Sequence, residues 1–143
     1  MTVSPVYRVS STSRGGGRDG EVVSETGRID LNLAPPVEMG GNGEGSNPEE
    51  LFSAGWAACF MGALRNVAKN AGATVPEGTE VSVTVGIGKD DTDDGFGLTA
   101  DISVYLPGLE TAQANELALA AHGFCPYSKA TRGNIASTVT SRV

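Results

Sequence analysis

Hydrophobic and polar residues alternate in several short segments of this chain, as they do in β-strands with one buried face. In the N-terminal third the segments are residues 6–9, 21–24 and 28–33, separated by turns that contain glycine. Two longer segments, residues 81–87 and 96–104, are joined by an aspartate-rich turn. We expect the first three to form short antiparallel strands and the last two to form a β-hairpin.

The pattern changes at residue 47, where apolar residues begin to recur at intervals of three and four, as on one face of a helix. Asn47 is a preferred N-cap residue, and Pro48 suits the first helical position. Gly72 suits the position just after a helix. The apolar residues are Leu51, Phe52, Trp56, Cys59, Phe60 and Ala63. The spacing predicts one long helix with Cys59 on its apolar face.

Residues 111–122 are rich in Ala, Leu, Glu and Gln and should form a second helix. Pro126 then opens a short helix that ends at Gly133, which places Cys125 beside a helix N-terminus. Residues 135–140 alternate again and predict a closing strand. The order of elements predicts an α+β fold with mainly antiparallel strands and helices on one face, in a single domain of residues 1–143.

Three loops carry candidate chemistry. Residues 13–20 hold four glycines and two arginines, which fits either a hairpin tip or a phosphate-binding loop, although the GxxxxGK[ST] spacing and a following helix are missing. Residues 34–46 are too rich in Pro and Gly for a helix or central strand, and we expect a loop that lines a site or wraps a partner. The aspartates of residues 90–94 resemble a calcium loop but lack the glutamate at position 12, so a solvated hairpin tip is favoured.

The composition narrows the classes of partner. Hydrophobic residues make up 39% of the 143 residues, charged residues 19%, and the net charge is −7, which describes a globular acidic chain. Such a surface repels phosphates, so nucleic acids and anionic membranes are not expected as partners. No run approaches the roughly 18 apolar residues of a membrane span, and the first residues lack a signal-peptide pattern, so a cytoplasmic location is expected.

The two cysteines are the residues most able to do chemistry. Cys125 has a helix N-terminus beside it, which favours a reactive thiolate, whereas burial in mid-helix would leave Cys59 inert unless a cation such as Arg18 or Arg14 came close. Both cysteines could equally be packing residues. Together with His122, the only histidine, they could supply three zinc ligands if the fold gathered them, but no CxxC motif supports a metal site.

The residues around both cysteines resemble a known family. NPEELFSAGWAACF at residues 47–60 and FCPYSKATRGN at residues 124–134 are similar to the Ohr branch of the OsmC/Ohr family, the organic hydroperoxide resistance proteins. Residues 16–20 and 35–46 match as well, so the resemblance spans nearly the whole chain. It implies an OsmC-like fold with a long central helix that bears the peroxidatic cysteine, in an intertwined homodimer with sites at the subunit interface.

The resemblance also implies a mechanism. Cys59 would be the peroxidatic thiolate and Cys125 the resolving thiol, while Arg18 would activate the thiolate and Glu49 would hold Arg18. The substrate would be an organic hydroperoxide, such as an alkyl or fatty-acid hydroperoxide. The reductant would be an external dithiol carried by a lipoylated protein, and no cofactor or metal would be bound.

The residues themselves lead to two further expectations. The apolar side chains of Met39, Phe52, Trp56 and Phe60 are candidates to line the substrate site. Glu49 and Cys59 are ten residues apart, about 15 Å along a straight helix, so one arginine cannot easily reach both. Either the helix breaks near Gly55 or the site is assembled from two chains.

Two other functions remain open at this point. One is a non-enzymatic dimer of the same fold that binds a small apolar ligand in a groove. The other is an OsmC-type peroxidase with a different substrate preference.

Overall fold

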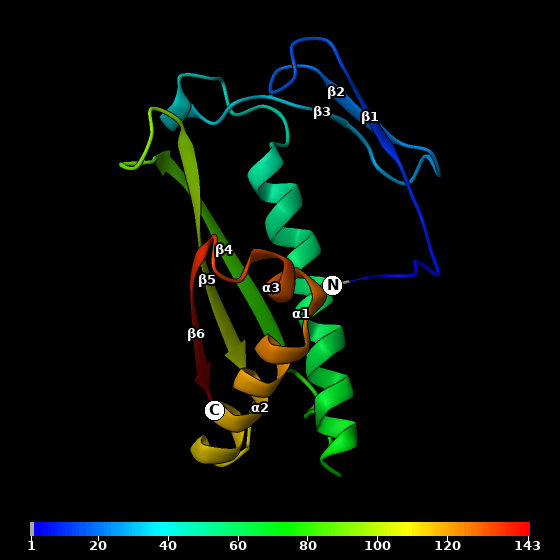
Figure 1. The fold of residues 1–143 in the computed structure, drawn as a ribbon, viewed down its shortest axis with the longest axis vertical. Helices are drawn as coiled ribbons and strands as arrows, with labels where there is room; N and C mark the ends of the chain where they lie inside the picture. Colours follow the sequence, from blue (N-terminus) through cyan, green and yellow to red (C-terminus); the bar gives the residue numbers. More distant parts are fainter. Residues whose placement is uncertain (1) are drawn as a thin grey trace. The chain divides into compact units, whose positions relative to one another are not determined.

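The computed structural model describes residues 2–143, and the chain divides into two compact units, one up to Pro48 and one from Glu49 onward (Figure 1). The expected single domain of residues 1–143 stays a prediction. None of the helices in residues 2–143 is both long enough and apolar enough to cross a membrane.

The N-terminal unit contains a three-stranded antiparallel sheet in the order β1-β2-β3. The strands are β1 (Ser11–Arg14), β2 (Glu21–Ser24) and β3 (Asp30–Asn32). Ser11 lies opposite Ser24 in the first pair, and Val23 lies opposite Asp30 in the second. Two of the three predicted strands, at residues 21–24 and 28–33, are therefore confirmed, whereas the first strand of the sheet lies at residues 11–14 and not at 6–9.

The prediction of a strand at residues 6–9 is wrong, because these residues have no regular secondary structure and Val6 is fully exposed. The physical reason lies in the neighbouring strand. β2 ends at Ser24, and a turn closed by the Gly27 N–H on the Ser24 carbonyl follows at once, so β2 offers these residues nothing to pair with. Ser10 instead donates from its N–H and its hydroxyl to the carboxylate of Glu25.

The glycine-rich turn of residues 15–20 is a hairpin connection from β1 to β2. Gly15 has φ +81°, and a Cβ on Gly20 would lie 2.1 Å from the Arg14 carbonyl oxygen, so the turn requires both glycines. A strand follows this turn, so it lacks the helix that a phosphate-binding loop needs.

The long loop that follows β3 is mostly irregular, as expected, and a parallel bridge between Leu33 and Ser46 brings its ends together. The structure adds a 3₁₀ turn, η1 (Val37–Met39), that the Pro- and Gly-rich composition did not predict. Pro36 precedes the turn in extended conformation, and Gly40 ends it in the left-handed conformation.

The C-terminal unit combines three helices with a three-stranded sheet in the order β4-β5-β6. Its elements are α1 (Pro48–Asn70), β4 (Glu80–Lys89), β5 (Phe96–Tyr105), α2 (Thr111–Phe124), α3 (Pro126–Thr131) and β6 (Ala136–Arg142). The α+β class, the hairpin and the predicted helices are confirmed. β4 and β5 are antiparallel with Glu80 opposite Tyr105, but β6 runs parallel to β5, which the sequence did not predict. Helices α2 and α3 form the crossover that a parallel pair requires.

The core of this unit lies between the helices and one face of the sheet. Trp56, Phe60 and Leu64, spaced four residues apart on α1, are fully buried. They pack in one cluster with residues of β5 and α2, among them Ile102 and Leu117. The apolar face predicted for α1 is therefore the face that the fold buries, and Cys59 lies at its edge.

Candidate active site

The two cysteines meet in the C-terminal unit, although 66 positions separate them in the chain. Both are free thiols, and their Sγ atoms are 3.6 Å apart. Cys125 is fully buried, whereas Cys59 is half-buried. The sulfur atoms are about 1.5 Å farther apart than in a disulfide, so a small movement would join them.

Cys125 owes its position to the break between two helices. It is both the C-cap residue of α2 and the N-cap residue of α3, with extended backbone (φ −60°, ψ 124°) and Pro126 after it. Its N–H donates to the carbonyl of Ala121, and its own carbonyl accepts from the N–H of Lys129. These backbone bonds tie Cys125 to both helices, and they fix the direction of its Cα–Cβ bond. The position beside a helix N-terminus that the sequence predicted is confirmed.

A third residue holds the end of α2. The guanidinium of Arg132 donates from Nη2 to the carbonyls of His122 and Gly123, at 3.2 and 3.5 Å. These carbonyls lie in the last turn of α2, where a helix leaves acceptors without partners. A positive group there also complements the helix dipole.

Helix α3 packs closely on α1 beside the thiols. A Cβ on Gly55 would lie 3.1 Å from the Tyr127 hydroxyl oxygen, so glycine allows the two helices to approach this far. The rings of Phe52 and Tyr127 stack with centroids 6.2 Å apart. The indole Nε1–H of Trp56 donates to the Ser128 hydroxyl at 3.0 Å, and both side chains are fully buried.

The surroundings of Cys59 within the C-terminal unit disfavour the ionised form of its thiol. Burial raises the pKa of the Cys59 thiol above its usual value, and the neighbouring Cys125 thiol raises it further. A hydrogen bond from the Tyr127 backbone N–H acts in the opposite direction, because it stabilises the charged sulfur. The sequence had predicted that burial would make this thiol inert without a cation.

His122 is near the site but does not complete a metal centre. Its ring lies 6.5 Å from that of Phe60, and its Nδ1 is buried without a hydrogen bond among the described residues. Burial lowers the pKa of His122, and the charge of Arg132 lowers it further. In residues 2–143 no three His, Cys, Asp or Glu side chains are placed to hold a metal ion.

The remaining predicted residues are spread over both units. Arg18 lies in the turn between β1 and β2, and Met39, 40% exposed, lies in η1. Glu49 lies in the first turn of α1, and this helix runs without a break through Gly55 to Asn70. The alternative of a helix broken near Gly55 is therefore wrong, and about 15 Å of continuous helix separates Glu49 from Cys59.

The aromatic candidates for the substrate site differ in exposure. Phe52 is partly buried at the edge of the core, with its ring 5.4 Å from that of Trp56. Trp56 and Phe60 are fully buried within the chain. Sequence reasoning did not find Ser128 or the Tyr127 backbone N–H, and the only signal for them was their place directly after Cys125.

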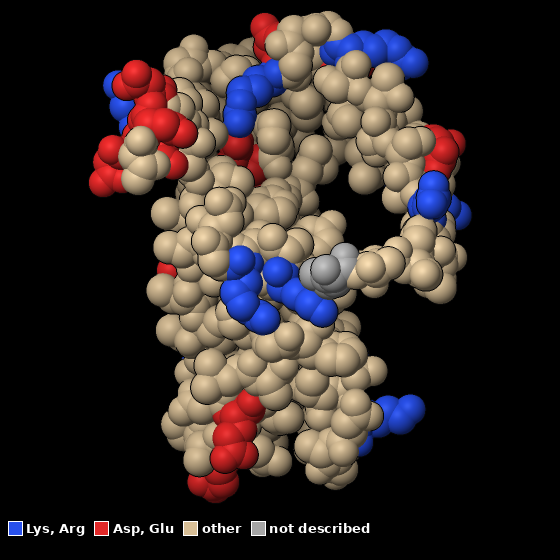
Figure 2. Space-filling view, viewed as in Figure 1, with Lys and Arg blue, Asp and Glu red and all other residues tan. Residues whose placement is uncertain are grey.

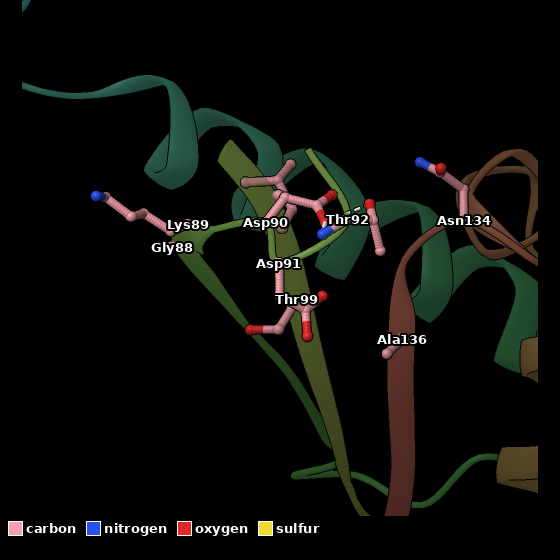
Figure 3. A pocket seen from close by; sticks show the side chains of 10 residues that line it. Gly88, Lys89, Asp90, Asp91, Thr92, Thr99, Asn134 and Ala136 are labelled. Carbon is pink, nitrogen blue, oxygen red and sulfur yellow. Dashed lines mark hydrogen bonds between the residues drawn. The ribbon is translucent and has the colours of Figure 1, made fainter. Parts of the chain in front are cut away.

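A separate cavity of about 500 Å³ lies at the end of the β4–β5 hairpin where the turn joins the two strands, and neither cysteine lines it (Figure 3). The hairpin tip supplies one side and Asn134 and Ala136 supply the other. The Asp90 carboxylate accepts hydrogen bonds from the N–H and hydroxyl of Thr92, which lower its pKa. Figure 2 shows acidic side chains gathered over this tip, as expected for its four aspartates.

Comparisons with known proteins agree with the fold. The family model described as OsmC-like protein matches residues 41–140. The organic hydroperoxide resistance protein of Xanthomonas axonopodis pv. citri is 42% identical over 136 residues, which cover 94% of each chain.

Two solved structures extend the comparison. That of an organic hydroperoxide resistance protein OsmC from Legionella pneumophila has a TM-score of 0.91 at 36% identity, covering 98% of this chain and 100% of the other. OhrB of Bacillus subtilis has a TM-score of 0.87 at 39% identity, covering 96% and 100%. The chain therefore belongs to the OsmC family, within its group of organic hydroperoxide resistance proteins.

Proposed function

We propose that this protein is a thiol-dependent peroxidase that reduces organic hydroperoxides to alcohols. The observation that carries the proposal is the pair of free thiols, Cys59 and Cys125, 3.6 Å apart in a chain with no other cysteine. The names of its relatives, which refer to organic hydroperoxide resistance, support the same activity.

The reaction uses the two thiols in sequence. The Cys59 thiolate attacks one oxygen of ROOH, the O–O bond breaks, and ROH leaves after it takes up a proton, so that Cys59 becomes a sulfenic acid. The Cys125 thiol then attacks this sulfur and expels water, which leaves a Cys59–Cys125 disulfide. An external dithiol reduces the disulfide and is itself oxidised to a disulfide.

The half-buried position of Cys59 fits its role as the sulfur that meets both peroxide and reductant. Cys125 is fully buried, so a molecule from solvent reaches Cys59 first. We infer that the reductant is a dithiol carried by a lipoylated protein. A cytoplasmic location would suit a pair of free thiols, because that compartment keeps thiols reduced.

Arg18 is the proposed source of the missing positive charge. Burial raises the pKa of the Cys59 thiol, and the Tyr127 amide alone opposes this effect within the C-terminal unit. A guanidinium beside the sulfur would favour the thiolate and the alkoxide that forms as the O–O bond breaks. Glu49 would hold the guanidinium in place.

The site is proposed to form between two copies of the chain. Helix α1 is continuous from Pro48 to Asn70, so Glu49 and Cys59 of one copy are about 15 Å apart. In a homodimer, one site would combine residues of both copies, so that Arg18 and Glu49 need not come from the same chain as the Cys59 they serve. The exposed apolar residues of the first ten positions, among them Val3, Val6 and Tyr7, fit an intertwined dimer in which a partner covers them.

An apolar lining would select alkyl and fatty-acid hydroperoxides over hydrogen peroxide. Phe52 lies at the edge of the core beside Trp56, and Met39 is exposed on η1. We propose that Met39 and Phe52 supply this lining, and that Trp56 and Phe60, which are fully buried within the chain, support it from behind. An alkyl chain would gain burial there, which hydrogen peroxide cannot.

The expected result of a turnover assay is rapid loss of cumene hydroperoxide in the presence of dihydrolipoamide and catalytic protein. The peroxide concentration is followed over time, with hydrogen peroxide as the matched substrate, which should react more slowly. Glutathione replaces the dithiol as a second control and should support less turnover. Peroxide loss no faster than with dihydrolipoamide alone would reject the proposal and favour a binding protein of this fold.

A further inference from the structure

The partners of the hydrogen bond between Trp56 and Ser128 each lie three residues from one of the two cysteines. Trp56 lies three residues before Cys59 on α1, and Ser128 lies three residues after Cys125, in α3. The Nε1–Oγ distance is 3.0 Å and the Sγ–Sγ distance is 3.6 Å. The hydrogen bond and the thiol contact are thus adjacent links between the same two segments, about one helical turn apart.

Helix α3 needs such a link to keep its place. It has six residues, too few for a helix that is stable by itself. Phe52 stacks on Tyr127, and Gly55 leaves room for the Tyr127 ring, but Tyr127 as a residue is 39% exposed. The Trp56–Ser128 hydrogen bond is directional and fully buried, so it fixes how α3 sits on α1.

The hydroxyl of Thr131, another buried residue of α3, does not link this helix to α1. Thr131 donates to the carbonyls of Tyr127 and Ser128, both within the same short helix. Its hydroxyl supports α3 internally and does not connect it to α1. Thr131 therefore provides a matched control.

We propose that Trp56 and Ser128 are positioning residues that hold the Cys125 sulfur against Cys59 for disulfide closure. The proposal rests on the proposed function for its place in the reaction, because closure there follows oxidation of Cys59. The step is the attack of the Cys125 thiol on the Cys59 sulfenic acid, with formation of one S–S bond and release of one water molecule. The hydrogen bond acts on this step through the position of α3.

The test measures closure without peroxide. Ellman's reagent, 5,5′-dithiobis(2-nitrobenzoate), converts Cys59 to a mixed disulfide and releases one thionitrobenzoate. Attack by Cys125 then releases the second and leaves the Cys59–Cys125 disulfide. The absorbance of thionitrobenzoate gives both rates, and only the second requires the two cysteines to be aligned.

Trp56→Phe and Ser128→Ala are each expected to slow closure about tenfold relative to the first release, because misplaced groups lose most of the advantage of proximity. The double variant should be no slower than the slower single variant, since both remove the same bond. Thr131→Val should close at the wild-type rate. Two independent single variants keep the test decisive if one of them fails to fold.

Closure at the wild-type rate in both single variants would overturn the proposal. Equal slowing in Thr131→Val, or equal slowing of both releases, would also overturn it, because either result indicates general loosening. A parallel reaction with cumene hydroperoxide tests the proposed function separately. If peroxide consumes no thiol in the wild-type protein, the peroxidase assignment fails, while the Ellman reaction still decides whether Trp56 and Ser128 align the cysteines.

Discussion

Replacing Cys59 with serine is expected to abolish turnover of cumene hydroperoxide with dihydrolipoamide, a loss of about a thousandfold or more. A serine hydroxyl is not ionised near neutral pH and is a far weaker nucleophile than a thiolate. It also cannot form the sulfenic acid that the second step consumes. Peroxide loss is measured at equal protein concentration, with circular dichroism to show that the variant is folded.

Cys125→Ser is the matched control for this variant. It keeps the Cys59 thiol, so it should consume about one equivalent of peroxide and then accumulate an oxidised Cys59, which dimedone can trap. The two serine variants thus separate the first step from the second. Undiminished turnover in Cys59→Ser would contradict the assignment of the peroxidatic thiol.

Replacing Arg18 with methionine is expected to lower the second-order rate constant for cumene hydroperoxide about a hundredfold at neutral pH. Burial raises the pKa of the Cys59 thiol in its own unit, and a guanidinium beside the sulfur would lower it. Removing that charge lowers the fraction of Cys59 that is thiolate at neutral pH. The pH at which Cys59 becomes reactive should therefore move upward. Methionine keeps most of the apolar part of the side chain, which limits other effects.

The pH profile is measured as the rate of Cys59 alkylation by iodoacetamide in the Cys125→Ser background, where one thiol remains. Arg14→Met is the control, since Arg14 is the last residue of β1, directly before the same turn, and is exposed, 3.7 Å from the Glu21 carboxylate. It should leave both the rate constant and the profile unchanged. The role of Arg18 would be excluded if Arg18→Met behaved like Arg14→Met.

Most of the elements could be predicted because their signals are local. Pro48 begins α1 and Gly72 follows its end, while the period of the apolar residues identifies the face that carries Trp56 and Phe60. Pro126 likewise identifies the break that places Cys125 between two helices. Such features depend on neighbours within about one turn of helix or one strand.

The wrong or missing predictions concern features that depend on pairing with residues distant in the chain. Residues 6–9 alternate like a strand, yet β2 ends at Ser24 and leaves them without a partner. β6 reads as an ordinary closing strand, and only the crossover through α2 and α3 makes it parallel to β5. A strand's partner and direction are tertiary properties that its own residues do not encode.

In the candidate site, too, the sequence identified residues but not the long-range contacts between them. The sequence indicated Cys59 and Cys125 as reactive residues, mainly through the family resemblance, and predicted that burial would disfavour the Cys59 thiolate. It could not show that their sulfur atoms lie 3.6 Å apart or that Ser128 accepts a hydrogen bond from Trp56. Those contacts join segments about 70 residues apart and exist only in the folded unit.

The most direct measurement counts free thiols before and after one equivalent of cumene hydroperoxide is added to the reduced protein. The Sγ–Sγ distance of 3.6 Å predicts that both thiols disappear together and that the protein mass falls by two hydrogen atoms, as one disulfide forms per chain. Dihydrolipoamide should then restore both thiols. If two free thiols per chain remain after the peroxide is added, the protein is not a peroxidase of the kind proposed.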